Sequence, residues 1–499
     1  MTLLERVASE EKETTNRRTL VDQAASSVKW SVLYNIVPRF VTPFSTMILA
    51  ALLTPADFGL VAIATFINAL SKILVDMGLG KAVIYQQADV DEAASVSFWL
   101  SNLMSVVLYG LLWFFAPWIS IAYHNDKVTS VIRVAALFVL LGGLATIPKA
   151  LLRRNMEFRR LFWVNSSFLI IQAVAAVILA LFGMGYWSII YGELIGMMIS
   201  TAIVWSTVHW RPKLVIQLST VRAMLNFSKW IMIAGFQNWM FLYADNAIAG
   251  LFLGVQGLGT YSLGFNIAIL VPAFMAASIG DVAYPTFCKL QESPQEVGRN
   301  LISLQKLLGT MLFPLALGLA ALAPSIVKLL YGNRWPDLGS VIGLLILMPG
   351  LGYIWSLNEH AYQAVGRPDI WIRISTLSLF ALCPILWIAA PHGLLIFTLA
   401  RFGCGLLLPL GNMVFGSRTL GIEMRDQIKA ISTPFLVSLI IFLVAFLLVR
   451  QWSPIDGILG WFKLCSIAAI GFVVYLLLIW RMDRELWNKL FLSLRKMLA

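Results

Sequence analysis

The chain has 499 residues, of which 59% are hydrophobic and 12% are charged, and its mean hydropathy is +0.82. A soluble protein carries about 25% charged residues, so this composition excludes a soluble globular domain and indicates a membrane protein. The net charge of +12 lies mostly between apolar segments, and we expect no nucleic-acid partner. The four cysteines and four histidines show no metal-ligand spacing, so we expect neither a metal nor a cofactor.

The N-terminal segment 1–27 mixes acidic and basic side chains and contains no apolar run, which excludes a signal peptide and predicts a polar cytoplasmic arm. Beyond it, apolar runs of about 20 residues, the length that crosses a bilayer, recur along the chain. We predict about fourteen membrane-spanning helices, near 28–52, 58–80, 95–119, 128–150, 161–183, 186–208, 228–250, 258–282, 301–325, 338–362, 370–390, 392–416, 430–450 and 456–480.

Lysine and arginine are concentrated in alternate loops, which orients the predicted helices. Because loops rich in these residues stay in the cytoplasm, both termini are predicted to be cytoplasmic, as is a linker at 209–227. The tail 481–499 places leucines at helical spacing among basic residues. We expect it to form an amphipathic helix on the inner leaflet.

An internal repeat appears when the sequence is shifted by 200 residues, which superposes Lys29-Trp30 on Lys229-Trp230, Leu53 on Leu253, Gly59 on Gly259 and Gly80 on Gly280. Further on, Ala116-Pro117 and Tyr123-His124-Asn125 resemble Ala323-Pro324 and Tyr331-Gly332-Asn333. Six predicted helices separate the two copies, and an even number preserves orientation. We therefore predict an all-α membrane fold with two parallel six-helix lobes, 28–208 and 228–416, and an appended helix pair at 430–480. Two such lobes indicate a transporter rather than a channel.

Four stretches carry a family resemblance: Leu52–Ala62, Asp76–Ala82, Leu151–Arg159 and Gly366-Arg367-Pro368-Asp369. Together with the helix number and the repeat, they resemble the polysaccharide transporter branch, the Wzx-type flippases, of the multidrug/oligosaccharidyl-lipid/polysaccharide exporter superfamily. The resemblance extends over essentially the whole chain.

The resemblance implies the location, the substrate and the direction of transport. The protein would lie in the bacterial inner membrane and would carry an oligosaccharide joined through pyrophosphate to undecaprenol toward the periplasmic leaflet, for lipopolysaccharide or exopolysaccharide assembly. Membrane lipids and other polysaccharide-assembly proteins are its candidate partners. In related lipid-linked precursor flippases the last two helices help to form a groove for the lipid tail, which assigns the same role to 430–480.

Charged residues inside predicted spans are the candidate site residues, because such residues are costly in a bilayer unless they face a cavity. Arg39 lies near the middle of the first span, and Arg401 lies a third of the way along the twelfth. A guanidinium can bind pyrophosphate through two parallel hydrogen bonds. The alternatives are an ion pair between helices for Arg39 and snorkelling to the outer interface for Arg401.

Acidic residues and one lysine complete the candidate set. Asp245 could bind sugar hydroxyls, pair with Arg39, or carry a coupling proton or cation. Glu193, between two glycines, is a second candidate for ion coupling. Lys72 and Asp76 are four residues apart and share a helix face, where they could bind substrate or form an ordinary interfacial pair.

Two other functions are weighed against the flippase. A membrane glycosyltransferase or polymerase would need a sizeable external loop, and the longest outer loop here has about a dozen residues, too few to fold alone. We therefore expect no enzyme. A drug/cation antiporter of the same superfamily would be expected to bind its cations through acidic residues, whereas this chain also places arginines in its spans.

Overall fold

The computed structural model describes residues 30, 37–38, 40–86, 89–214, 218–451 and 457–482. Helices dominate these ranges, and no strand occurs among the residues described. Twelve helices in the described part are long and apolar enough to cross a membrane, and a shorter apolar helix covers Phe40–Leu52. The predicted all-α membrane fold is confirmed, whereas the number fourteen stays a prediction. The predicted arm 1–27 and nearly all of the tail 481–499 lie outside the described residues.

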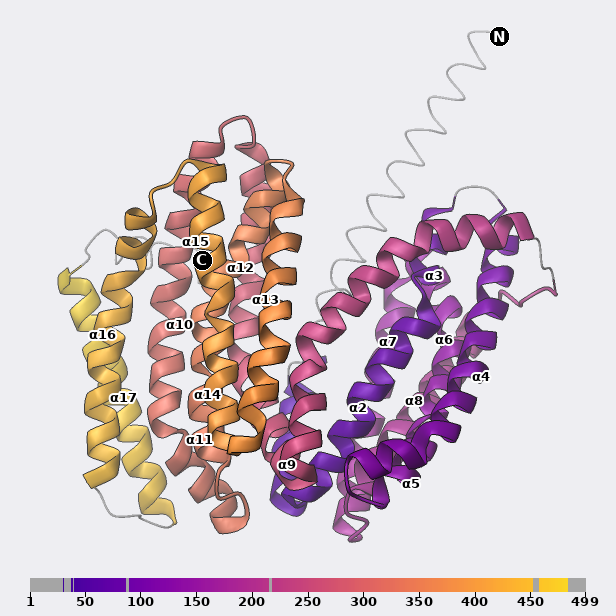
Figure 1. The fold of residues 1–499 in the computed structure, drawn as a ribbon, viewed down its shortest axis with the longest axis horizontal. Coiled ribbons are helices and arrows are strands. Elements are labelled where there is room, and N and C mark those ends of the chain that lie inside the picture. The colour runs from indigo at the N-terminus through magenta and orange to yellow at the C-terminus, as the bar shows by residue number, and fades with distance from the viewer. Residues whose placement is uncertain are drawn as a thin grey trace. The chain divides into compact units, whose positions relative to one another are not determined.

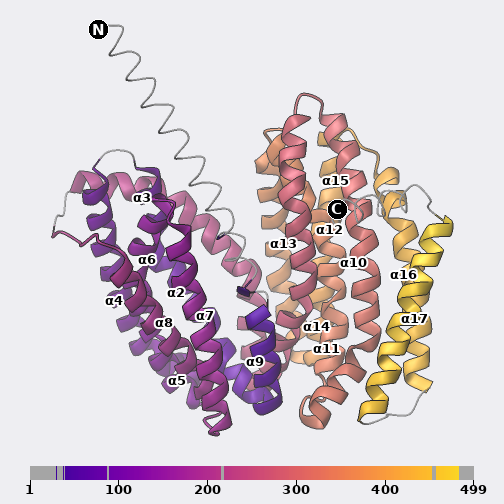
Figure 2. The ribbon, with the colours of Figure 1, turned by 180° about the vertical axis from the view of Figure 1, so that it is seen from behind.

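The chain divides into two compact units between Tyr243 and Ala244. In the first unit, Figures 1 and 2 show α3 and α5 at opposite ends. The helices of this unit are α2 (Pro55–Asp76), α3 (Leu79–Tyr85), α4 (Val90–Ala122), α5 (Lys127–Ala135), α6 (Leu137–Arg154), α7 (Phe158–Leu181), α8 (Trp187–Thr207) and the first part of α9 (Leu218–Lys289).

In the second unit, α16 and α17 lie side by side along α10 (Figure 1), and the view from behind agrees (Figure 2). Their membrane-length parts, Met424–Val449 and Ile458–Met482, overlap the predicted spans 430–450 and 456–480. The elements of this unit are the remainder of α9, α10 (Pro294–Tyr331), η1 (Gly332–Arg334), α11 (Leu338–Leu345), α12 (Leu347–Ala364), α13 (Pro368–Ala389), η2 (Ala390–His392), α14 (Leu394–Gly405), α15 (Leu407–Leu420), α16 (Met424–Gln451) and α17 (Ile458–Met482).

The division between the units falls inside α9, beyond the predicted linker 209–227. The described part of that linker is bound to the first unit. The Trp210 ring packs edge-on against Phe98, with centroids 5.9 Å apart, and the Lys213 amide donates to Ser95 Oγ at 3.2 Å. Thr220 Oγ1, at the start of α9, donates to Glu92 at 2.9 Å. These contacts explain why the first unit continues into α9.

Both units run through the same succession of helices, as the sequence repeat predicts. In each, a long helix with an internal proline (Pro117 in α4, Pro324 in α10) precedes a helix that is interrupted at one residue. The interruption falls at Ala136 between α5 and α6 and at Ile346 between α11 and α12. A positive φ recurs at three matching positions, which pair His124 with Gly332, Met156 with Gly366 and Gly183 with Gly393.

Helix α9 contains a sharp corner at Gly254, whose φ of 66° and ψ of −179° are accessible only to glycine. In a straight helix, Asp245 and Tyr261 would be about 24 Å apart along the axis. The Tyr261 hydroxyl instead lies 2.6 Å from Asp245 Oδ2, so the chain turns back at Gly254. The predicted spans 228–250 and 258–282 are therefore distinct helical segments joined by one residue rather than by a loop.

The first unit makes the equivalent corner with different chemistry. Thr54, 200 residues before Gly254, is the N-cap of α2, and Pro55 opens the helix. Asp57 completes a capping box with Thr54, and its other carboxylate oxygen accepts a hydrogen bond at 3.1 Å from the Tyr186 amide, at the start of α8. This corner is held by hydrogen bonds, whereas the corner at Gly254 depends on the backbone freedom of glycine.

Candidate functional site

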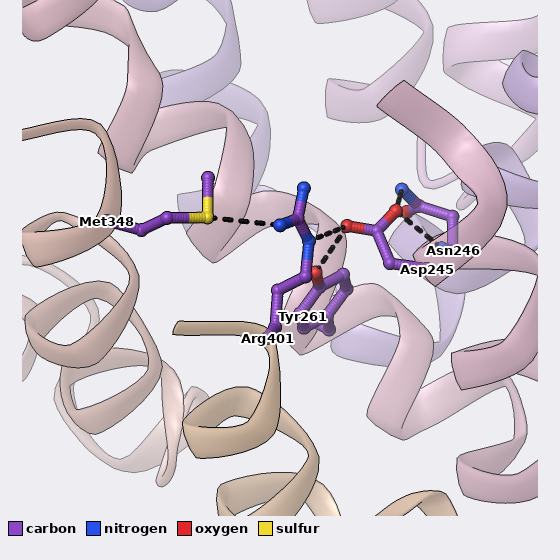
Figure 3. A network of polar contacts seen from close by, with 5 residues as sticks. All are labelled: Asp245, Asn246, Tyr261, Met348 and Arg401. Atoms are coloured by element: carbon purple, nitrogen blue, oxygen red, sulfur yellow. Dashed lines mark hydrogen bonds and ion pairs between the residues drawn. The ribbon is translucent and has the colours of Figure 1, made fainter. Parts of the chain in front are cut away.

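Asp245 and Arg401 form a buried ion pair in the second unit (Figure 3). Arg401 Nε donates to Asp245 Oδ2 at 2.8 Å, and the side chains are 2% and 0% exposed, respectively. Asp245 comes from α9, two residues after the first unit ends at Tyr243, and Arg401 comes from α14. The sequence nominated both residues separately, and the structure joins them.

Further polar atoms saturate the Asp245 carboxylate. The Tyr261 hydroxyl donates to Oδ2 at 2.6 Å, and Asn246 donates to Oδ1 from its backbone amide at 2.8 Å and from its side-chain amide at 3.0 Å. Together with Arg401 these groups supply four hydrogen bonds to one carboxylate. A buried charge is tolerated when it is paired and hydrogen-bonded in this way.

The Arg401 guanidinium also contacts a methionine sulfur and an aromatic ring. Nη1 donates to Met348 Sδ at 3.2 Å, and the guanidinium carbon lies 5.7 Å from the centre of the Phe265 ring. The pair is thus enclosed by side chains from α9, α12 and α14 of one unit. In this conformation Arg401 neutralises Asp245, and the alternative pairing of Asp245 with Arg39 stays a prediction. Arg39 itself lies outside the described residues. Roles of Asp245 and Arg401 in substrate binding stay predictions.

Glu193 lies in α8, on the side that faces the protein. Met198, five residues further on and therefore rotated by about 140° on the helix, is 58% exposed. Glu193 is half-buried and has no hydrogen bond or ion pair to another described residue. On either side of it, Gly192 and Gly196 let α8 approach the backbone of α7 closely. Its predicted role in ion coupling stays a prediction.

Lys72 and Asp76 occupy the end of α2, and no ion pair joins them among the described contacts. Asp76 Oδ1 instead accepts a hydrogen bond from the Gly80 amide at 3.4 Å, where α2 passes into α3. Lys72 is exposed, and its charge acts on the half-buried Lys149 of α6, as does that of Arg153. We call Lys72, Lys149 and Arg153 the basic cluster.

Of these three residues, only Lys72 is a candidate site residue from the sequence. Lys149 and Arg153 lie at the predicted cytoplasmic end of a span, where basic residues are ordinary, although their spacing of four residues places them on one face of a helix. The cluster could hold an anionic group. In the described part of the chain, no group of three or more His, Cys, Asp or Glu side chains could hold a metal ion.

The sequence of residues 48–339 matches the protein family described as polysaccharide biosynthesis protein. Over 441 residues, the chain is 22% identical to the lipopolysaccharide biosynthesis protein WzxC of Escherichia coli (strain K12). The aligned region covers 86% of this chain and 88% of that protein. It is 21% identical to the teichuronic acid biosynthesis protein TuaB of Bacillus subtilis (strain 168), over 86% and 89% of the two chains.

A solved structure shares the fold. The inward closed conformation of the lipid II flippase MurJ superposes with a TM-score of 0.75, covering 92% of this chain and 99% of that one, at 15% sequence identity. The similarity shows that this chain shares the all-helical fold of that protein.

Proposed function

Because the chain belongs to the family of polysaccharide biosynthesis proteins, we propose that it flips an oligosaccharide, joined through pyrophosphate to a polyprenol, across a bacterial inner membrane. The substrate moves from the cytoplasmic to the periplasmic leaflet, and both termini are cytoplasmic. The two repeated units, which the sequence assigns to 28–208 and 228–416, change their conformation to alternate access to the two sides. The pair α16–α17 contacts the lipid tail.

The basic cluster is the observation that supports this proposal. A pyrophosphate carries several negative charges, and amines and guanidinium groups bind it through charge-assisted hydrogen bonds. Lys149 is half-buried within a membrane-length helix beside two further cations, an arrangement that is costly without an anionic ligand. Arg39 and Lys72 are the sequence candidates for the same anion, and Lys149 with Arg153 extends the set.

The alternatives find less support. The relatives described above are named for polysaccharide assembly, and transport without chemistry on the sugar fits a fold shared with a flippase. A drug/cation antiporter would have no need for three clustered cations, which repel cationic drugs. Neither alternative gives a role to the basic cluster.

Deleting the gene in the producing organism tests the proposal directly. The saccharide-bearing lipid is expected to accumulate on the cytoplasmic side and to clear when the wild-type gene is returned. Lys149→Gln with Arg153→Gln is expected to lower polymer output by roughly tenfold or more, since each lost charge-assisted hydrogen bond removes about 1.5–3 kcal/mol.

Lys127→Gln is the matched control, because Lys127 is an exposed base elsewhere in the first unit, over the ring of Tyr186. It should leave polymer output unchanged at equal amounts of inserted protein. Deletion cells that accumulate no lipid-linked saccharide would rule out the proposed function.

A further inference from the structure

Four side chains gather where α9 and α12 of the second unit meet: Tyr284, Glu359, His360 and Gln363. We call them the α9–α12 patch. The rings of Tyr284 and His360 lie with their centroids 6.0 Å apart and are tilted by 52°. Gln363 Nε2 donates to Glu359 Oε1 at 3.1 Å. An aromatic pair and a carboxylate–amide pair thus occupy neighbouring positions on two helices.

A glycine allows this arrangement. A Cβ atom at Gly280 would lie 2.9 Å from His360 Nε2, so the imidazole rests against the α9 backbone in space that any other residue would occupy. This close approach sets the ring beside Tyr284, one helical turn further along α9. The His360 ring is therefore held by the backbone of α9 and not only by its own helix.

The patch is open to a ligand. Tyr284 is 42% exposed, Gln363 is exposed, and Glu359 and His360 are half-buried. Oε2 of Glu359, Oε1 of Gln363 and the ring nitrogens of His360 have no hydrogen-bond partner among the described residues. The patch offers an aromatic face with hydrogen-bonding groups beside it.

These groups match the chemistry of a sugar. A pyranose ring presents an apolar C–H face, which packs on an aromatic ring, and hydroxyl groups, which donate to carboxylate and amide oxygens. Specific sites for small polar ligands combine these elements, an apolar wall with a few placed polar groups. A phosphate would be repelled by the Glu359 carboxylate.

The same location in the first unit has the opposite chemistry. The contact between Gly280 and His360 recurs as a contact between Gly80 and Ala150, where a Cβ on Gly80 would lie 3.6 Å from Ala150 Cβ. With α6 and α12 aligned at their interruptions, Glu359 corresponds to Lys149, and Gln363 corresponds to Arg153. At these equivalent positions the first unit has two basic side chains of the basic cluster, whereas the second unit has a carboxylate and an amide.

We propose that the α9–α12 patch binds the saccharide part of the lipid-linked substrate, with Tyr284 against a sugar ring and Glu359 and Gln363 on its hydroxyl groups. The inference rests on the proposed function and adds to it. It assigns the sugar to a patch whose residues all belong to the second unit.

Two lipids separate the two roles in a binding experiment on the full-length protein in detergent. One is undecaprenyl pyrophosphate, which has no sugar. The other is the saccharide-bearing lipid extracted from producing cells that lack this gene. Native mass spectrometry or thermophoresis measures the affinity for each. Glu359→Gln and Tyr284→Ala should weaken binding of the saccharide-bearing lipid about tenfold and leave binding of undecaprenyl pyrophosphate unchanged.

The controls fix the interpretation. Lys149→Gln should weaken the binding of both lipids, and Phe380→Ala, which removes an aromatic side chain that is 74% exposed on α13, should weaken neither. Glu359→Gln keeps the size of the side chain, so its result does not depend on a change of packing. If the patch variants bind both lipids as the wild type does, or lose both equally, the assignment of the sugar is overturned. A wild type that binds neither lipid overturns the proposed function itself.

Discussion

The ends of α6 and α12 are built alike and carry different chemistry. In α6 the Glu157 amide donates to Leu152 O at 2.9 Å, and in α12 the Arg367 amide donates to Tyr362 O at 2.8 Å, so both helices end in a Schellman motif. Within their last two turns, α6 carries Lys149 and Arg153, whereas α12 carries Glu359 and Gln363. The two repeats have kept the backbone and changed the side chains, which is how one scaffold can supply sites of two kinds.

A second contrast concerns buried charge. On the helix that precedes the corner at Gly254, the second unit carries Asp245, paired with Arg401. The residue 200 positions earlier, before the corner at Thr54, is Ser45, whose hydroxyl donates to Thr42 O at 2.9 Å in its own helix. The second unit therefore depends on a charged contact at a place where the first unit needs only a local hydrogen bond.

The largest expected effect comes from breaking the buried ion pair. Arg401→Ala leaves Asp245 charged and enclosed, and we expect the free energy of unfolding to fall by about 3–5 kcal/mol. Denaturant unfolding in mild detergent measures the loss. Replacing both residues, Asp245→Leu with Arg401→Leu, should cost less than Arg401→Ala alone. A double variant as unstable as the sum of its singles would show that the two charges do not interact.

A smaller effect is expected from the glycines between α7 and α8. A Cβ at Gly192 would lie 2.9 Å from Gln172 O, a backbone atom that cannot move by itself. Gly192→Ala should therefore destabilise the first unit by about 1–3 kcal/mol. In the second unit, Gly411 faces the side chain of Ile374 at 2.7 Å, which can change its rotamer. Gly411→Ala should lower the melting temperature less than Gly192→Ala does, and the reverse order would contradict this account.

The two corners should differ in what they tolerate. Asp57→Ala removes a capping box and the hydrogen bond from the Tyr186 amide, and we expect it to cost about 1 kcal/mol. Asp57→Asn, which keeps an acceptor oxygen, should recover part of that loss. Thermal unfolding of the purified variants provides the measurement. Equal melting temperatures for Asp57→Ala and the wild type would show that the cap does not hold the first corner.

The smallest effect is expected at the exposed ion pairs that follow the two Schellman motifs. Glu157 pairs with Arg160 in the first unit, and Asp369 pairs with Arg367 and Arg373 in the second. Because all of these side chains are at least partly exposed, solvent screens their charges. Glu157→Gln and Asp369→Asn should leave the melting temperature unchanged. A clear fall in the melting temperature of either variant would contradict this expectation and would show that the exposed ion pair stabilises its turn.

Much of the fold could be predicted from the sequence, since apolar runs of membrane length leave few alternatives. The corner at Gly254 was expected to be a loop at 251–257. It is a single glycine because that residue alone accepts the backbone angles that reverse the chain, and no apolar pattern reports such angles. The repeat register does indicate the corner, because the 200-residue shift aligns Gly254 with Thr54, the residue that caps α2.

The candidate site was harder to predict. Asp245 and Arg401 were nominated because intramembrane charges are costly, but 156 residues separate them, and periodicity within a helix gives no information on such distant pairs. Lys149 and Glu359 lie at the ends of the predicted spans 128–150 and 338–362, where a charged side chain is ordinary and the sequence gives no reason to predict a site. Both residues become site candidates because their helices contact a neighbouring helix closely, α12 at Gly280 and α6 at Gly80. Composition cannot show such contacts.

The residues with positive φ that follow α4 and α6 have a consequence for engineering the protein. In the second copy of the repeat the matching residues are Gly332 and Gly366, with φ of 62° and 74°, whereas the first copy places His124 and Met156 at 49° and 57°. A side chain is disfavoured there, and glycine is not. Each copy of the repeat therefore suggests stabilising substitutions for the other. His124→Gly and Met156→Gly, which introduce the residue found in the second copy, are the first substitutions to make in order to raise the stability of this protein.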